Sequence, residues 1–209
     1  MTTWASFLNG VRLYLNDTRD TPKYSDKLIY LYTCDALRDY SNWFPLITRT
    51  EIDCVGGVYA VPSDLMDIRA VEIPAATYLK TRMARPGFKF RTLSHPSLYW
   101  KIGSFIYLNS DTTDSIFLTY GACHTLPTSE TDTTFEFTVP EGDMELLNLY
   151  ARAKCLGQTR SRQANLDRFK RRGERDDNPL INETQTLMDE YYSKIAERSK
   201  GGVVYLYGV

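Results

Sequence analysis

The first 45 residues show the spacing of two amphipathic helices. Apolar residues recur every three or four positions over 4–16, after the candidate N-caps Thr2 and Thr3, which predicts the first helix. A second helix is predicted over 24–45, with Ser25 as its N-cap and Pro45 closing its far end. Its apolar residues form two rows, so its non-polar surface is wider than the roughly 100° stripe of a single packing contact. We therefore expect this helix to have neighbours on more than one side, in a core or between subunits.

After position 45 the hydrophobic period changes to two, which predicts strands over 47–55, 58–61, 68–73, 98–108, 116–120 and 135–139. Gly56-Gly57 separates the first two strands and is free to take the positive φ of a tight hairpin turn. The clearest hairpin turns at Gly103-Ser104, in the middle of 98–108. Residues 46–139 therefore indicate a small antiparallel sheet or sandwich inserted between helices.

Helical spacing returns after Pro140. One helix is predicted from 144 to at least 156, continuing through 169 with a bend or break at Gly157, and a last helix follows Asn178-Pro179 to about Ser199. The predicted fold class is α+β, a bundle of about four helices with an inserted antiparallel β-sheet or small sandwich and an extended C-terminal tail. Three domains are expected. They are a discontinuous helical domain over 1–45 and 140–200, an inserted β-rich domain over 46–139 and the tail over 201–209.

Composition adds little to this picture. A chain of 209 residues with a formal net charge of -1 is typical of a soluble globular protein. No window approaches the roughly 18 apolar residues of a membrane span, and the first ten residues lack the pattern of a signal peptide. We therefore expect the protein to be made and used in a cytosol. The scattered cysteines predict reduced and mostly buried thiols rather than disulfides or zinc ligands: Cys34, Cys54, Cys123 and Cys155.

The sequence offers no set of residues typical of a catalytic site. His95 lies in a turn-like segment, and His124 follows Cys123 at a strand end, where successive side chains point to opposite faces. Both histidines are interpreted as ordinary surface or half-buried residues. Gly56-Gly57 does not open a helix, so it predicts no phosphate site, and the acidic residues after Asn109 do not complete a calcium loop. We expect no catalytic residue, no cofactor and no metal, and no enzyme activity.

Charge is unevenly distributed. Residues 152–175 carry nine basic and two acidic side chains, a local charge of +7 that leaves -8 for the remainder. No helix-turn-helix, zinc-finger or RNP signature accompanies them, so sequence-specific binding of nucleic acid is not expected. Two interpretations remain open: a solvated helix face, or a segment that faces an acidic partner or DNA that passes without being read. The candidate contact residues are Arg168, Lys170, Arg171 and Arg172.

The last seven residues, 203–209, carry no charged side chain and are mostly β-branched or aromatic, behind the Gly201-Gly202 pair. Such a segment gains stability by adding a strand to a sheet edge, either its own or a partner's. A partner is the favoured interpretation, because tails that pack nowhere are generally polar. The candidate contact residues are Val203, Val204, Tyr205, Leu206 and Tyr207.

The order of elements carries several short motifs. They are W-x-x-F-L, L-N-D and Y-S-D-x-x-L in the first two helices and their connection, Y-x-V-P-S-D-L with a following I-x-x-V in the strands, and a Leu/Tyr/Ala-rich helix near 144–155. Their residues are Trp4, Phe7, Leu8, Leu15, Asn16, Asp17, Tyr24, Ser25, Asp26, Leu28, Pro45, Tyr59, Val61, Pro62, Ser63, Asp64, Leu65, Ile68, Val71, Leu147, Tyr150 and Ala151. In this order the chain resembles the head-to-tail adaptor (connector) proteins of tailed bacteriophages. Its sheet-rich middle departs from the all-helical members.

The resemblance implies a structural virion protein. Such adaptors form a homo-oligomeric ring, usually of twelve copies, beneath the portal protein, and they join the DNA-filled head to tail or nozzle proteins. Genomic DNA then passes through the channel without being read, and assembly takes place in the host bacterial cytoplasm. The tail would reach the portal or the next copy, and the basic segment would face the portal or the DNA. The alternative is a binding module for carbohydrate or a host ligand, with stacking faces from Tyr99, Trp100, Tyr107 and Tyr120.

Overall fold

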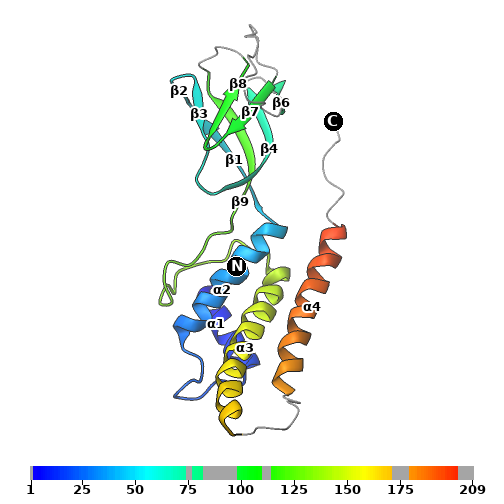
Figure 1. Cartoon of the computed structure of the whole chain (residues 1–209). Helices are drawn as coiled ribbons and strands as arrows, with labels where there is room; N and C mark the ends of the chain where they lie inside the picture. Colours follow the sequence, from blue (N-terminus) through cyan, green and yellow to red (C-terminus); the bar gives the residue numbers. More distant parts are fainter. Residues whose placement is uncertain (1, 74–76, 82–97, 110–113, 171–178, 202–209) are drawn as a thin grey trace. The chain divides into compact units, whose positions relative to one another are not determined.

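The structure is a computed structural model that describes residues 2–73, 77–81, 98–109, 114–170 and 179–201 (Figure 1). The chain forms two compact units. One comprises Met1–Phe44 and His124–Val209, and the other comprises Pro45–Cys123. The described helices lie in the first unit and the described strands in the second, so the predicted α+β class is confirmed.

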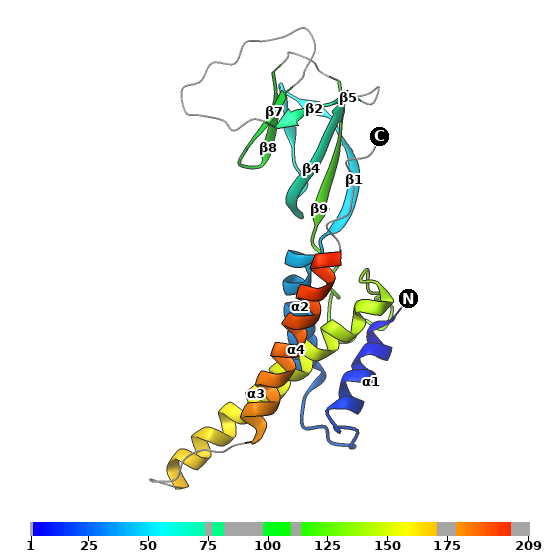
Figure 2. The same cartoon turned by 90° about the vertical axis from the view of Figure 1, so that its right-hand side faces the viewer.

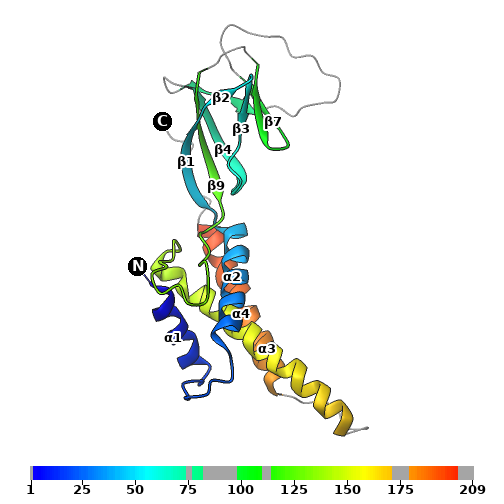
Figure 3. The same cartoon turned by 90° about the vertical axis from the view of Figure 1, so that its left-hand side faces the viewer.

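The helical unit is built around α3. Its helices are α1 (Trp4–Tyr14), α2 (Asp26–Trp43), the short 3-10 turn η1 (Glu141–Asp143), α3 (Met144–Lys170) and α4 (Pro179–Gly201). The other three α-helices each pack against α3, as Figures 2 and 3 show. Their shared core includes Trp4, Leu37, Leu147 and Tyr191. The predicted caps are correct, since Thr3 accepts a hydrogen bond from the Ser6 amide and Ser25 accepts one from the Leu28 amide.

The predicted break at Gly157 is absent, because α3 runs through that position as one continuous helix. A Cβ built at Gly157 would lie 3.6 Å from the Thr184 methyl group of α4, which is ordinary van der Waals contact. The glycine thus lies where α4 packs on α3. Packing along α4 supports the helix there and offsets the roughly 1 kcal/mol that glycine costs relative to alanine.

The strand predicted at 135–139 is also wrong. The segment from His124 to Val139 belongs to the helical unit, where Phe135, Phe137 and Val139 enter its core. The segment is extended, so alternate side chains point inward, but its ladder is limited to one bridge between Thr3 and Glu136. Alternation here reports one face packed on helices rather than a place in a sheet.

The second unit contains two packed sheets. The first has the order β1-β9-β4-β5 and the second the order β2-β3-β8-β7-β6. All pairs are antiparallel except β6 with β7. Tyr59, Val71, Ile106 and Leu118 belong to the core of this unit. The strands are β1 (Leu46–Ile52), β2 (Cys54–Val55), β3 (Val58–Ala60), β4 (Leu65–Ile73), β5 (Thr77–Tyr78), β6 (Lys80–Thr81), β7 (Leu98–Ile102), β8 (Phe105–Leu108) and β9 (Ile116–Ala122).

Both predicted glycine turns are correct. Gly56 and Gly57 have φ values of 63° and 83° between β2 and β3, and Gly103 has a φ of 57° between β7 and β8. The predicted single strand over 47–55 is wrong, however, because it divides at Asp53. Its first part pairs with β9 in one sheet and its second part with β3 in the other. The period of two persists through this change of sheet, so the pattern alone does not reveal it.

Candidate interaction surfaces

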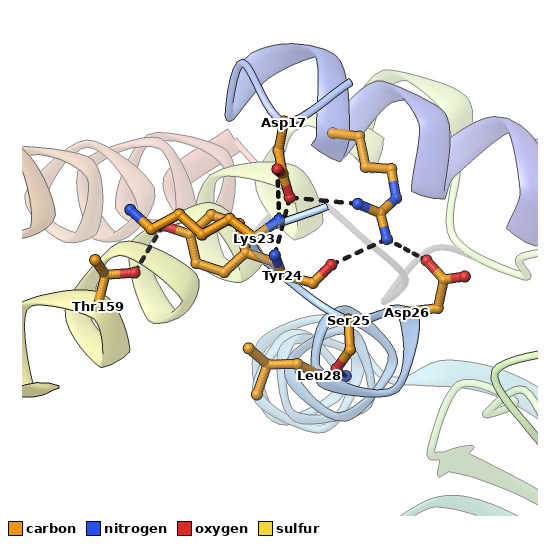
Figure 4. Close-up of polar contacts among 8 residues, drawn as sticks. Asp17, Lys23, Tyr24, Ser25, Asp26, Leu28 and Thr159 are labelled. Carbon is orange, nitrogen blue, oxygen red and sulfur yellow. Dashed lines mark hydrogen bonds and ion pairs between the residues drawn. The ribbon is translucent and has the colours of Figure 1, made fainter. Parts of the chain in front are cut away.

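A buried carboxylate organises the connection between α1 and α2 (Figure 4). Asp17 is 3% exposed and accepts hydrogen bonds from the backbone amides of Lys23 (2.7 Å) and Tyr24 (3.0 Å). Its carboxylate also lies 3.3 Å from a guanidinium nitrogen of Arg12. The preceding Asn16 has a φ of 51°, the left-handed conformation that asparagine tolerates well, and it turns the chain at the end of α1. The L-N-D motif is therefore a device for closing this loop.

The Y-S-D motif completes the same network (Figure 4). Arg12 donates to the Tyr24 carbonyl oxygen at 3.0 Å and pairs with the Asp26 carboxylate. The Tyr24 hydroxyl lies 2.9 Å from the Thr159 hydroxyl of α3. These contacts hold the start of α2 against both α1 and α3. The motifs that carry the family resemblance thus build a scaffold, and they offer no reactive group.

His124 is more buried than predicted, with 4% exposure. Its Nε2 lies 2.9 Å from the Phe44 carbonyl oxygen, which can only accept, so Nε2 carries the proton. Its Nδ1 then accepts from the Thr138 hydroxyl at 2.8 Å. Burial lowers the pKa of the imidazole, which keeps the ring neutral. His124 therefore caps the end of α2 and has no free nitrogen for chemistry, while His95 lies outside the described residues.

All four cysteines are free in the structure, and their burial is divided, whereas most were predicted to be buried. Cys34 and Cys155 are buried, Cys54 is half-buried and Cys123 is exposed. Burial raises the pKa of the Cys155 thiol to about 12. Among the described residues, no group of histidines, cysteines and carboxylates is arranged to hold a metal ion.

The aromatic side chains of the predicted binding module are largely enclosed. Tyr99, Trp100 and Tyr120 are each less than 10% exposed, and Trp100 stacks on Tyr107 with ring centroids 5.9 Å apart. The Tyr120 hydroxyl donates to the Asp64 carboxylate at 3.2 Å. A sugar needs an exposed ring face to stack on, so the burial of these rings argues against the carbohydrate-binding alternative.

The predicted contact residues fall beyond what the structure describes. Val203, Val204, Tyr205, Leu206 and Tyr207 lie outside the described residues, as do Arg171 and Arg172. Arg168 and Lys170 lie on the last turns of α3, but their side chains are not described. Both sets remain predictions.

A shallow groove between α1 and α3 was not anticipated from the sequence. It has a volume of about 270 Å³. Its lining comes from one face of each helix, with Phe7, Gly10 and Tyr14 from α1 and Met144, Glu145, Asn148, Leu149 and Arg152 from α3. The only signal in the sequence was a glycine inside an otherwise regular helix.

Comparison with known families decides the identity. The model of the SU10 adaptor protein family matches residues 2–198, nearly the whole chain. The chain belongs to the SU10 adaptor protein family. The resemblance to phage head-to-tail adaptors is thereby confirmed, and the SU10 adaptors are structural proteins rather than a family of enzymes. A search of curated proteins found no match. Within the described part of this SU10 adaptor, no helix is both long and apolar enough to span a membrane.

Proposed function

We propose that this SU10 adaptor forms a closed ring beneath the portal of the phage head and joins the DNA-filled head to the tail. The observation that carries the proposal is the family match over residues 2–198. The proposed ring is a homo-oligomer of twelve copies that contacts portal protein on one side and tail or nozzle proteins on the other. DNA would pass through its channel, held only by contacts to phosphate that allow sliding.

Exposed apolar side chains on the helical unit support an assembling protein. Leu13, Tyr14, Leu31, Trp43 and Tyr192 are all at least 45% exposed. The wide apolar surface predicted for α2 is thus only partly covered within one chain, since Leu31 and Trp43 lie on that helix. Single exposed apolar residues are ordinary, but a ring needs two different adhesive surfaces on each subunit.

The end of α3 is a further candidate for contact. In Figures 2 and 3 its C-terminal half runs away from α1 and α2 beside α4. This half carries Arg160, Arg162, Arg168 and Lys170 in the sequence. A basic projection of this kind suits either an acidic portal surface or passing DNA.

The proposal is tested by measuring the mass of the purified full chain, alone and mixed with the portal protein of the same phage. Light scattering after size exclusion should show a ring-sized species, either at once or when the portal is added. A protein that stays monomeric in both conditions would contradict the ring.

Deletion of Val203–Val209 tests the role assigned to the tail. The fold should survive, with an unchanged circular dichroism melt, because the described cores of both units are built from residues that precede this segment. Attachment to the portal should become unstable, since the strand that the tail adds to a sheet edge is lost. Normal attachment of the shortened chain would show that the tail is not the portal contact.

A further inference from the structure

Gly10 lies in the middle of α1, where a glycine costs roughly 0.5–1 kcal/mol of helix stability relative to alanine. A Cβ built there would meet only the Asn148 amide nitrogen, at an ordinary distance of 3.8 Å. Packing among the described residues therefore does not require a glycine at this position. Its absent side chain instead leaves space in the α1–α3 groove, which Gly10 helps to line.

Arg152 gives the groove a positive charge that no acidic side chain of the described residues pairs with. Its guanidinium lies 4.9 Å from the centre of the exposed Tyr14 ring, and its buried Nε has no hydrogen-bond partner among the described residues. The other charged residue of the groove, Glu145, is already paired with Lys194 at 2.6 Å. The walls formed by Phe7, Met144 and Leu149 are apolar. The groove therefore suits an apolar or aromatic side chain that has a carboxylate close beside it.

The outer face of α4 presents that combination. Tyr192 is 45% exposed, and Asp189 is exposed one turn earlier on the helix. Asp189 accepts a hydrogen bond from Gln185 at 2.8 Å, and in the described part of the chain it has no cationic partner. Ala196 is also exposed on this side of the helix. We name Gln185, Asp189, Tyr192 and Ala196 the α4 stripe.

The α4 stripe and the groove lie on different sides of α3. The Tyr192 ring contacts Tyr191, whose ring centroid is 5.3 Å from that of Tyr150 on α3. Tyr150 lies two residues from both Asn148 and Arg152 of the groove, and two residues correspond to a rotation of about 200° around an α-helix. Tyr150 therefore faces nearly the opposite side of α3 from these two residues. A chain therefore cannot fill its own groove with its own stripe, whereas head-to-tail contacts between copies can.

We propose that the α4 stripe of one copy docks in the α1–α3 groove of a second copy, with Tyr192 between the apolar walls and Asp189 paired with Arg152. This interface rests on the proposed ring and supplies its contact between neighbours. A contact between two different surfaces repeats from copy to copy, and it closes into a ring when the rotation allows.

Charge reversal tests the pair in the full chain. Arg152→Glu and Asp189→Arg should each raise the dissociation constant of self-association by about tenfold or more, because each leaves two like charges facing each other. The double variant should recover most of the loss. Glu197→Arg is the control matched to Asp189→Arg, because it makes the same charge change at an exposed site on α4 outside the stripe. It should assemble as the wild type does. Association is measured by light scattering, with and without portal protein.

A second test does not depend on Arg152. In a Cys123→Ser background, a chain carrying Asn148→Cys is mixed with one carrying Tyr192→Cys and treated with a short bismaleimide. The mixture should give cross-linked dimers, whereas Glu197→Cys in place of Tyr192→Cys should not.

The outcomes separate this interface from the ring itself. Two results with an assembling wild type would overturn the α4–groove contact and leave the ring. In the first, both single reversals assemble as well as the wild type. In the second, the double variant assembles no better than either single variant. Failure of the wild type to assemble, alone and with portal, overturns both.

Discussion

Replacing Asp17 with alanine tests whether the L-N-D motif holds the helical unit together. The carboxylate accepts hydrogen bonds from the partly buried amide of Lys23 and the buried amide of Tyr24, and it faces Arg12. Its removal therefore leaves both amides without their acceptor. Arg12 keeps the Tyr24 carbonyl oxygen and Asp26 as partners, which limits the cost on its side.

The expected destabilisation follows from these hydrogen bonds. A hydrogen bond to a charged group contributes about 1.5–3 kcal/mol, and the substitution removes the two that the backbone amides donate. Together these two bonds contribute about 3–6 kcal/mol. Breaking a buried charged pair costs about 3–5 kcal/mol, which falls within that range. We therefore expect Asp17→Ala to reduce the free energy of unfolding by about 3–5 kcal/mol. That is a large share of the 5–15 kcal/mol typical of a domain. Asp17→Asn retains one acceptor oxygen and should be less destabilising.

Urea unfolding followed by far-ultraviolet circular dichroism measures this change. The described helices all lie in one unit, so the helical signal reports the unit that contains Asp17. Asp20→Ala is the matched control, an exposed acid in the same loop. The urea midpoint should fall for Asp17→Ala with an unchanged slope. A difference of less than about 0.5 kcal/mol between the two variants, the range of ordinary surface substitutions, would refute the assigned role.

Three further predictions concern pH, thiol reactivity and charge. Because burial lowers the pKa of His124, the unfolded chain takes up a proton at a higher pH than the folded one. The free energy of unfolding should therefore fall as pH drops through about 6.5, and it should level off below the folded pKa. His124→Gln should remove this dependence in urea titrations across pH, and a His95→Gln variant that also removed it would contradict the assignment. Ellman's reagent should modify Cys123 first in the native protein, so Cys123→Ser should abolish the fastest phase, whereas a persisting fast phase would place the reactive thiol elsewhere. Replacing four basic residues with Gln should weaken assembly on the portal most at low salt, because screening shortens such attractions to about 8 Å at physiological ionic strength. These residues are Arg168, Lys170, Arg171 and Arg172. A variant that assembles as well as the wild type at every salt concentration would leave only the interpretation of a solvated face.

Local signals in the sequence were sufficient for most elements of the fold. The caps Thr3 and Ser25 and the turn at Gly103 each depend on a few neighbouring residues, so reading them needed no knowledge of the tertiary structure. The family resemblance was readable for the same reason, because motifs such as L-N-D close loops through hydrogen bonds between residues only a few positions apart.

Long-range partners decided the rest. The extended segment at 135–139 has the period of a strand, but contact with α1 and the helical core makes it part of the helical unit. The strand divides at Asp53 within an unbroken alternating pattern, because β1 and β2 find partners in different sheets. The α1–α3 groove depends on residues about 140 positions apart in the sequence, such as Gly10 and Arg152. Periodicity reports which side chains are buried, whereas only the tertiary structure determines what buries them and which apolar surface is left for another molecule.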